Sequence, residues 1–401
     1  MNTLFLAQRV PYPPNKGEKI RTYHQIRYLL ESGHRVSVAS PYENLQEKND
    51  FDALKRQLGV NSRKSQLGFK AWRYLSGLFA NKPLSVSNFY CRDLQKTIDQ
   101  WLLEEAFDNI VCTSSSMAEY VFRSTALTRQ DRRPRLVMDF MDLDSDKWRQ
   151  YSLTSAFPRS LVFRREANLM SRYEREVFRT FDHCLFISEA EVELFCARSD
   201  VQGEPPLAIG NGIDTDFFVP SASPPGGSQP IIIFTGVMNY KPNIDAVMWF
   251  ATRVWPDIQS RYPQARFIVA GMKPVAEIRG LAGNRGVEVT GFVEDILPYY
   301  HQSNIFVAPL RIARGVQNKV LQSFACGIPV VSTSMGAEGI DCVHGKDILI
   351  ADTSEQFIEK IERLLVDPEL YASISRSALD LVKRDYSWDG RLKPFAEILD
   401  R

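Results

Sequence analysis

The chain has 401 residues, of which 44% are hydrophobic and 24% are charged. This composition is that of an ordinary globular protein with two or three domains, and it excludes disordered and collagen-like chains. The formal net charge of +1 argues against a nucleic-acid-binding protein, which would carry an excess of basic residues.

Short apolar runs alternate with helical stretches through the first half of the chain. After the first run, apolar residues recur at helical spacing between Ile20 and Leu30, and Gly33 is a typical helix stop. Strands alternating with helices favour a parallel sheet. The predicted strands are residues 3–7, 35–40, 109–113, 135–141, 183–188 and 206–210.

A Pro, Gly and Ser-rich segment, residues 219–230, predicts a linker before a second series of the same kind. The strands predicted beyond it are 231–236, 265–271, 287–293, 305–310, 329–333 and 348–352, and the helices are 243–261, 316–326, 354–366, 368–385 and 388–400. We therefore expect an α/β protein with two Rossmann-like domains, 1–218 and 231–387, that face a central cleft. In such sheets ligands bind beyond the carboxyl ends of the strands.

Several common motifs are missing from the sequence. It has no GxGxxG after a strand, no GxxxxGK[ST], no HExxH and no GxSxG, and its cysteines and histidines show no metal-type spacing. We therefore expect no metal and no cofactor. The apolar run near the N-terminus is too short for a signal peptide, and no run is long enough to span a membrane, so we expect a cytoplasmic protein.

A basic loop before a helix is the strongest candidate site. The predicted strand ends at Leu310, and a helix begins near Val316. The N–H groups and dipole of a helix N-terminus favour an anion, and basic side chains there would suit a diphosphate. The alternative is an ordinary solvated loop. The candidate residues are Arg311, Arg314, Gly315, Asn318 and Lys319.

Two further loops combine glycine with basic residues after a predicted strand. Gly236 and Lys241 follow the first strand of the second half, and Pro242 marks a helix start. Gly17 lies after the first strand of the chain, where a glycine lets the backbone approach a ligand, and Lys16, Lys19 and Arg21 flank it. The alternatives are a surface lysine and a flexible basic loop.

An acidic run follows the predicted strand 135–141. Carboxylates at a strand end can act as a general base, accept hydroxyl hydrogen bonds or hold a metal. The alternative is that they form turns and helix caps. The residues are Asp139, Asp142, Asp144 and Asp146.

Taken in order along the chain, these motifs resemble the retaining GT-B glycosyltransferases of family 4. A closer similarity is to sugar transferases of exopolysaccharide clusters linked to PEP-CTERM and exosortase systems. The segments that carry the family resemblance are PYPPNKGEKIR (11–21), IGNGIDTDFFVP (209–220), FTGVMNYKPN (234–243), VTGFVEDILPYY (289–300) and KVLQSFACGIPVVST (319–333). Those that carry the closer similarity are VPYPPNKGEKIR (10–21), DFMDLDSDKWRQY (139–151), YEREVFRTFDHCLFISEAE (173–191) and RGVQNKVL (314–321).

The resemblance implies a metal-independent enzyme that moves a sugar from a nucleotide diphosphate to a carbohydrate or a lipid-linked carbohydrate. It also implies that the helix 388–401 joins the N-terminal domain. Arg314, Lys319 and Asp142 would then be catalytic. The donor-binding residues would be Gly17, Gly236, Lys241, Arg311, Gly315, Asn318 and Gln322.

The sequence departs from the family pattern at two positions. Gln322 replaces a glutamate that binds the ribose of the donor, and Met141 replaces a histidine near the sugar. These departures leave open a non-catalytic binding or scaffold subunit that kept the fold. A nucleotide-sugar epimerase is a second alternative, because that activity also uses this two-domain architecture.

Residues 63–83 combine basic side chains, among them Lys70 and Arg73, with aromatic and aliphatic ones. Such a helix can lie in the headgroup region of a membrane, which would place a peripheral enzyme at the inner membrane face. The alternative is that its apolar residues pack on the sheet while the basic ones stay solvated. The apolar residues at helical spacing are Trp72, Leu75, Leu78 and Phe79.

Overall fold

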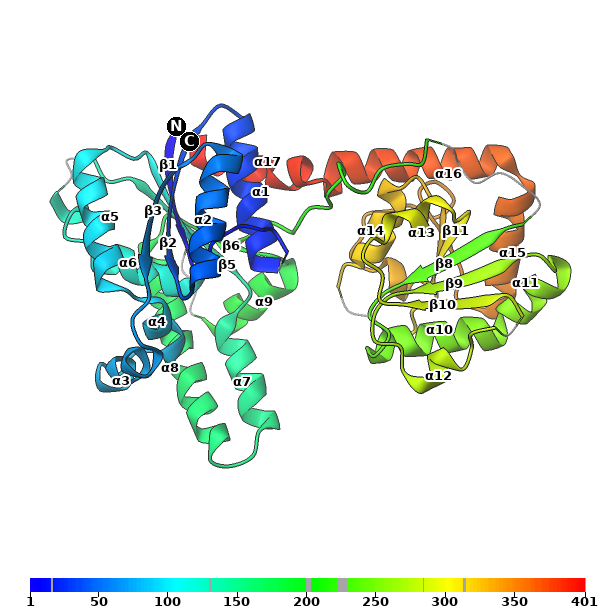
Figure 1. Cartoon of the computed structure of the whole chain (residues 1–401), viewed down its shortest axis with the longest axis horizontal. Helices are drawn as coiled ribbons and strands as arrows, with labels where there is room; N and C mark the ends of the chain where they lie inside the picture. The colour runs from blue at the N-terminus through cyan, green and yellow to red at the C-terminus, as the bar shows by residue number, and fades with distance from the viewer. Residues whose placement is uncertain are drawn as a thin grey trace. The chain divides into compact units, whose positions relative to one another are not determined.

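The chain forms two compact domains. The structure is a computed structural model that describes residues 1–15, 17–129, 132–199, 203–222, 229–283, 285–312 and 315–400. The N-terminal domain comprises Met1–Asn211 and Arg391–Arg401, and the C-terminal domain comprises Gly212–Gly390 (Figure 1). Part of the predicted linker, residues 223–228, lies outside the described residues.

The N-terminal domain is built on a parallel sheet whose strands, within the described residues, follow the order β3-β2-β1-β4-β5-β6-β7. The central strands β1, β4 and β5 are almost entirely buried and mostly apolar, because helices cover both faces of such a sheet. The strands are β1 (Asn2–Ala7), β2 (Arg35–Tyr42), β3 (Asn61–Gln66), β4 (Asn109–Thr113), β5 (Arg135–Met141), β6 (His183–Phe186) and β7 (Leu207–Ala208).

Strand β3 is absent from the strands predicted from the sequence. Its residues, NSRKSQ, are all polar or charged, and each is exposed or half-buried. It lies at one edge of the sheet and, among the described strands, pairs with β2. Edge strands often carry charged residues, so they lack the apolar pattern by which strands are recognised.

Two helical pairs extend from the sheet of the N-terminal domain (Figure 1). Helices α7 and α8 form a hairpin, and α3 packs on α4. The helices of this domain are α1 (Gly17–Glu31), α2 (Leu45–Leu58), α3 (Lys70–Phe79), α4 (Leu84–Phe89), α5 (Arg92–Glu104), α6 (Ala118–Phe122), α7 (Asp144–Thr154), α8 (Arg159–Thr180) and α9 (Glu189–Arg198).

The last helix, α17 (Trp388–Asp400), contributes most of its length to the N-terminal domain. Leu392, Phe395 and Leu399 are buried, and the Phe395 ring lies 6.4 Å from that of Phe5 in β1. The Arg135 guanidinium donates to the Leu399 carbonyl at 3.0 Å. The final helix is thus part of the core of the domain that the start of the chain builds.

The C-terminal domain has a second parallel sheet, whose described strands follow the order β10-β9-β8-β11-β12-β13. Ile232 and Phe234 lie in one apolar cluster and Ile233 in another, because successive side chains of a strand point to opposite faces. The strands are β8 (Ile231–Thr235), β9 (Arg266–Ala270), β10 (Val287–Gly291), β11 (Ile305–Ala308), β12 (Val330–Ser332) and β13 (Leu349–Ile350).

Helix boundaries in this domain follow their capping residues. Thr353 and Gln356 form a capping box at the start of one helix, and Asp367 caps the next ahead of Pro368. The helices are α10 (Lys241–Arg253), α11 (Trp255–Arg261), α12 (Ala276–Arg279), α13 (Leu297–His301), α14 (Asn318–Ala325), α15 (Ser354–Val366), α16 (Pro368–Leu381) and a π-helical turn (Val382–Tyr386).

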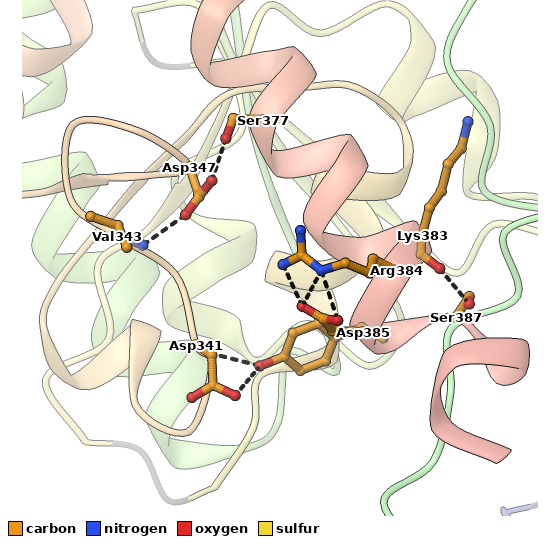
Figure 2. A network of polar contacts seen from close by, with 9 residues as sticks. Asp341, Val343, Asp347, Ser377, Lys383, Arg384, Asp385 and Ser387 are labelled. Carbon is orange, nitrogen blue, oxygen red and sulfur yellow. Dashed lines mark hydrogen bonds and ion pairs between the residues drawn. The ribbon is translucent and has the colours of Figure 1, made fainter. Parts of the chain in front are cut away.

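The π-helical turn lies where the chain enters and leaves the C-terminal domain. The Tyr386 carbonyl accepts a hydrogen bond from the Ile213 N–H at 2.7 Å. The Tyr386 hydroxyl accepts one from the Asp341 N–H, also at 2.7 Å, and Figure 2 shows this contact at Asp341. A Cβ at Gly212 would lie 2.5 Å from the Trp388 backbone, so only glycine fits there. The two crossing segments are therefore held against each other within this domain.

Candidate functional site

A cavity of about 790 Å³ lies in the N-terminal domain, beyond the carboxyl ends of its central strands. Thr113 ends β4, Met141 ends β5, and both line the cavity together with Gln8, which follows β1. Gly17 and Asp142, two of the predicted site residues, also line it. The cavity thus lies where parallel sheets bind ligands.

Two residues at the floor of the cavity have left-handed backbone conformations. Ser114 has a φ of 75° and Met141 a φ of 65°, and each directly follows or ends a strand. Such angles are uncommon for residues other than glycine, and they are found at ligand sites held in place by surrounding structure. The turn at Met141 directs the chain from β5 into Asp142 and the start of α7.

A buried ion pair holds this floor. Arg21 of α1 and Asp139 of β5 are almost fully buried, and Arg21 Nε donates to Asp139 Oδ2 at 2.7 Å. Gln25 Nε2 donates to the same oxygen at 2.6 Å, and the Arg21 guanidinium also donates to the Ile209 carbonyl at 2.7 Å. Arg21 is therefore a structural residue that ties α1, β5 and the segment after β7 together, and it is not part of a flexible basic loop.

The remaining carboxylates of the acidic run have separate environments. Asp142 is exposed at the cavity. Asp144 also lines the cavity and accepts a hydrogen bond from Ser115 Oγ at 3.2 Å, and burial raises its pKa. Burial alone would raise the pKa of Asp146, but hydrogen bonds from Arg198, Gln150 and Arg149 lower it overall. Asp146 is thus a structural ion-pair residue.

In the C-terminal domain, Lys319 lies in the first turn of α14. Its Nζ donates to Asn243 Oδ1 at 2.5 Å and lies 4.6 Å from the centre of the Phe234 ring. Burial lowers the pKa of Lys319 to about 8. The Gln317 side chain makes no capping hydrogen bond within the described residues, so the first N–H groups of α14 remain available to an anion.

Close backbone packing shapes the strand ends next to Lys319. Gly236 follows β8 and Gly271 follows β9, and a Cβ at Gly271 would lie only 1.8 Å from the Gly236 carbonyl oxygen. A Cβ at Gly236 would lie 2.6 Å from Asn243 Nδ2. Gly236 therefore leaves room for the amide of Asn243, which in turn orients Lys319.

Gln322 lies one turn after Lys319 on α14. Its Oε1 accepts a hydrogen bond from the Tyr300 hydroxyl at 3.2 Å, and that hydroxyl lies 2.9 Å from Thr235 Oγ1. Tyr300 is fully buried, and burial raises its pKa above the usual range. The neutral tyrosine thus fixes the Gln322 amide, whose NH₂ group keeps its donor capacity.

Two protein-family models match the chain over these two domains. One, described as a glycosyl transferase 4-like domain, matches residues 16–212, and the other, described as glycosyl transferases group 1, matches residues 229–367. Both domains are glycosyltransferase domains, and the fold is GT-B. The Gly17 loop lies in the first match, and α14 with Lys319 lies in the second.

Relatives of this glycosyltransferase are distant in sequence. An uncharacterised 44.6 kDa protein of the cps region of Klebsiella pneumoniae is 21% identical over 393 residues, which are 94% of each chain. A GDP-mannose-dependent phosphatidylinositol monomannoside mannosyltransferase of Mycolicibacterium smegmatis is 23% identical over 47% of this chain and 54% of its own.

The solved structure of Anabaena Alr3699/HepE in complex with UDP is similar over the full length of both chains. The TM-score is 0.61 at 16% identity. The same protein in complex with UDP-glucose covers 100% of this chain and 99% of its own, with a TM-score of 0.58 at 16% identity. This likeness shows a shared fold.

The other predicted donor residues of the glycosyltransferase lie around α14 and α10. Gly315 has a φ of 70°, and Gly315, Asn318 and Lys241 are exposed. Arg311 makes two hydrogen bonds to Asp245, of 2.6 and 3.0 Å, so an anion would have to compete with that carboxylate for it. Arg314 lies outside the described residues.

Two residues that organise these sites were not predicted from the sequence. Asn243 positions Lys319, although 76 residues separate them. Trp148 lines the cavity of the N-terminal domain from α7. The one local signal for Asn243 is its place one residue after Pro242, at a helix start beside a strand end.

The segment 63–83 differs from the interpretation that its apolar residues belong to the core, whereas its contact with a membrane stays a prediction. The apolar residues do not pack on the sheet: Trp72 is 72% exposed and Phe79 is 89% exposed. Of the basic residues, Arg73 is buried and donates to Glu43 at 2.9 Å, and Lys82 pairs with Glu119. Helix α3 thus has an exposed apolar face whose nearby cations are largely engaged within the domain.

Within the described ranges, none of the helices has the length and apolar character needed to cross a membrane. The same residues include no group of three or more His, Cys, Asp or Glu side chains placed to hold a metal ion.

Proposed function

We propose that the protein transfers a sugar from a nucleoside-diphosphate donor to a saccharide or lipid-linked saccharide acceptor. The observation that carries the proposal is the position of Lys319, a partly buried cation at the uncapped start of α14. A diphosphate leaving group needs such a cation together with free backbone N–H groups. The complexes of Alr3699/HepE with UDP and with UDP-glucose support a nucleotide-sugar donor.

The proposed mechanism relies on preorganised charge. Lys319 is held by Asn243 and partly shielded from water, so its ammonium group would stabilise the negative charge that develops on the departing diphosphate. Gly236, Gly315 and Asn318 would let the backbone approach the phosphates, and Gln322 would hydrogen-bond the ribose. Lys241, Arg311 and Arg314 would add positive charge. We assign no metal to this chemistry.

In the N-terminal domain, Asp142 lies at the cavity, which we assign to the acceptor. Gly17 lies at the same cavity, where a residue without a side chain would let the backbone approach the donor. Asp142 would accept a hydrogen bond from the reacting hydroxyl or stabilise the positive charge on the sugar. We expect Asp142→Asn to lower kcat about tenfold or more with little change in donor affinity. An unchanged kcat would instead assign the carboxylate to the turn that begins α7.

Finer aspects of the proposal rest on the family resemblance. We propose membership of family 4, retention of the anomeric configuration, and a role in exopolysaccharide synthesis of the PEP-CTERM type. The Klebsiella relative from a cps region supports the polysaccharide role. We also propose that the enzyme works in the cytoplasm at the inner membrane face, with the exposed apolar face of α3 in contact with the membrane.

A thermal-shift screen of nucleotides and nucleotide sugars tests the donor site. A bound nucleotide raises the unfolding temperature by mass action. We expect at least one of UDP, GDP, ADP and TDP to do so for the wild type, and Lys319→Ala to weaken that binding. The exposed Lys346, in the turn before β13, provides a control variant, Lys346→Ala, in which a surface lysine outside the predicted site is removed.

The stabilising nucleotide then identifies the donor sugars to assay. Lys319→Ala should lower kcat/KM by about 100-fold, the usual scale for losing one charge-stabilising donor. Wild-type kinetics in this variant would remove Lys319 from the site. Conversion of the donor sugar to its epimer without any acceptor would show that the protein is a nucleotide-sugar epimerase and not a transferase.

A further inference from the structure

Trp148 presents a fixed aromatic ring to the cavity of the N-terminal domain. It lies on α7, is half-buried, and packs against the apolar core of the domain while it also lines the cavity. The Phe163 ring lies 5.5 Å from the indole ring, tilted by 34°, and the Tyr151 ring lies 5.8 Å away at 81°. These contacts from α7 and α8 hold the indole in one orientation before any ligand binds.

The indole N–H of Trp148 has no hydrogen-bond partner among the residues that the structure describes. Two other tryptophans show the usual arrangement. Trp101 Nε1 donates to the Glu105 carboxylate at 3.0 Å, and Trp255 Nε1 donates to the Arg285 carbonyl at 2.8 Å. A buried tryptophan normally finds such an acceptor. The N–H of Trp148 is therefore available to an oxygen of a ligand.

Polar side chains from other elements line the same cavity. Asp142 is exposed just before α7, and Lys147 is exposed next to Trp148. Asn88 of α4 has a buried amide oxygen, Oδ1, that accepts no hydrogen bond within the described residues. The aromatic ring is thus accompanied by a carboxylate, an ammonium group and an amide oxygen, which can all bind hydroxyl groups.

A pyranose ring matches this combination of groups. Its C–H bonds form an apolar face, and its hydroxyl groups project from the edge of the ring. The face of an aromatic ring is electron-rich and attracts such C–H groups. A purely apolar ligand would leave Asn88 Oδ1 and Asp142 without partners, which is costly. An open-chain polyol would satisfy those groups but offers no flat face to the indole.

We propose that Trp148 is a specificity-determining residue that packs against one face of a pyranose ring of the acceptor, while Asp142 and Asn88 bind the hydroxyl groups of that ring. This inference rests on the proposed transferase function and assigns a residue to the choice of acceptor. Because the contact needs an uninterrupted C–H face, a sugar with an axial hydroxyl directed at the indole should bind more weakly than its epimer.

Methyl glycosides of glucose, mannose, galactose and N-acetylglucosamine are the probes, and sorbitol is the control that has hydroxyl groups but no ring. Saturation-transfer NMR on the full-length protein should detect binding of at least one glycoside. The strongest saturation should fall on the C–H protons of one ring face. Sorbitol should bind at least about fivefold more weakly, because it gains no contact with the aromatic face.

Three variants test the residue itself. Trp148→Leu keeps an apolar side chain but removes the aromatic face, and it should weaken binding of the best glycoside at least about fivefold and reduce the preference among epimers. Trp148→Phe keeps a ring but loses the N–H, and it should cost about twofold. Trp72→Leu is the matched control and should change binding less than about twofold, because Trp72 is 72% exposed on α3 and lies outside the described lining of the cavity.

Equal binding of sorbitol, saturation spread evenly over the sugar, or an equal loss in Trp72→Leu would each overturn the proposal, and so would the absence of binding by every glycoside. The one-face saturation pattern of the wild type and the Trp148→Phe variant keep the test valid if circular dichroism shows that Trp148→Leu is unfolded.

A donor sugar is the other source of a pyranose ring. If UDP-glucose bound more tightly than UDP and Trp148→Leu removed that difference, the ring at Trp148 would be that of the donor and the assignment to the acceptor would be wrong. Nucleotide thermal shifts on the same preparations separate this inference from the proposed function. Stabilisation by a nucleotide without binding of any glycoside would reject the role of Trp148 and leave the transferase intact.

Discussion

The two domains share a parallel sheet but differ at the carboxyl ends of their strands. In the C-terminal domain, Gly236 and Gly271 bring the ends of two strands into backbone contact, and a few side chains around Lys319 complete the site. In the N-terminal domain, the helical pairs α3–α4 and α7–α8 extend beyond the strand ends and enclose a cavity of about 790 Å³.

The difference suits two kinds of ligand. Close backbone packing and one oriented cation fix a small rigid anion such as a diphosphate. Inserted helices can vary in length and in side chains without disturbing the sheet, so they suit a ligand that differs from one enzyme to another. We therefore expect substitutions at the C-terminal site to displace the backbone and side chains that position the diphosphate. Substitutions in the helices around the N-terminal cavity should instead change which ligand binds there.

The largest expected effect is in the N-terminal domain, where the cavity floor depends on a buried charge pair. Arg21→Met leaves Asp139 charged and without its ion-pair partner, which should lower the free energy of unfolding by about 3–5 kcal/mol. Arg27→Met on the same helix breaks an exposed pair with Glu31 and should cost under about 1 kcal/mol. Urea unfolding with hydrogen exchange on β5 measures both, and equal losses would contradict the role of the buried pair.

The next effect tests the close packing of the C-terminal strand ends. Gly271→Ala would place a Cβ 1.8 Å from the Gly236 carbonyl oxygen, and we expect it to destabilise the domain by about 3 kcal/mol. Gly283→Ala is the control, because its φ is also positive, 78°, but no described atom lies within 4 Å of the added Cβ. Gly283→Ala should lower the free energy of unfolding by about 1 kcal/mol, from backbone strain alone. Equal losses in thermal unfolding would show that the contact does not matter.

A pH profile distinguishes the cation of the C-terminal site from the carboxylates of the N-terminal cavity. Only the protonated Lys319 stabilises a diphosphate, and burial lowers its pKa to about 8, so kcat/KM should fall as the pH rises through that value. Lys319→Arg, with a guanidinium that stays protonated, should remove this alkaline limb while keeping part of the activity. An alkaline limb that persists in Lys319→Arg would belong to another group.

The smallest expected effect is at Gln322. A carboxylate at this position still accepts the Tyr300 hydrogen bond, so Gln322→Glu should fold normally and tighten donor binding by no more than about 1 kcal/mol. Gln322→Leu removes this acceptor from the buried Tyr300 hydroxyl, which keeps its contact with Thr235, and should weaken binding. Titration with the stabilising nucleotide measures both. A large loss in Gln322→Glu would show that the glutamine NH₂ group donates to the donor.

Most of the fold followed from local sequence patterns. Buried strands such as β1 are continuous apolar runs, and helix starts are marked by residues such as Thr353 and Pro368. Strand β3 was not predicted, because an all-polar strand contradicts the usual relation between polarity and burial. An all-polar edge strand carries no local signal of its position. For α3, the sequence left a core helix and a membrane-surface helix open, and the exposed apolar face excludes the first.

The candidate sites were predictable only in part, for a related reason. The placement of Lys319 at a helix start and of Asp142 at a strand end follows from chain order. The ion-pair partner of each charged residue does not follow from chain order. Arg21 and Asp139 are 118 positions apart in the sequence, and Arg311 and Asp245 are 66 apart. Whether a charge is free for a ligand depends on such long-range pairing, which composition and spacing do not encode.

The position of α17 has a consequence for synthesis on the ribosome. Residues 212–390 form a continuous domain that can fold as soon as they emerge, but the N-terminal domain needs Phe395 and Leu399 from α17, which is translated after them. The domain translated first is therefore completed last. Until Phe395 has been translated, the surface of β1 that it covers stays open, and a nascent chain truncated before that residue would expose it to chaperones and proteases.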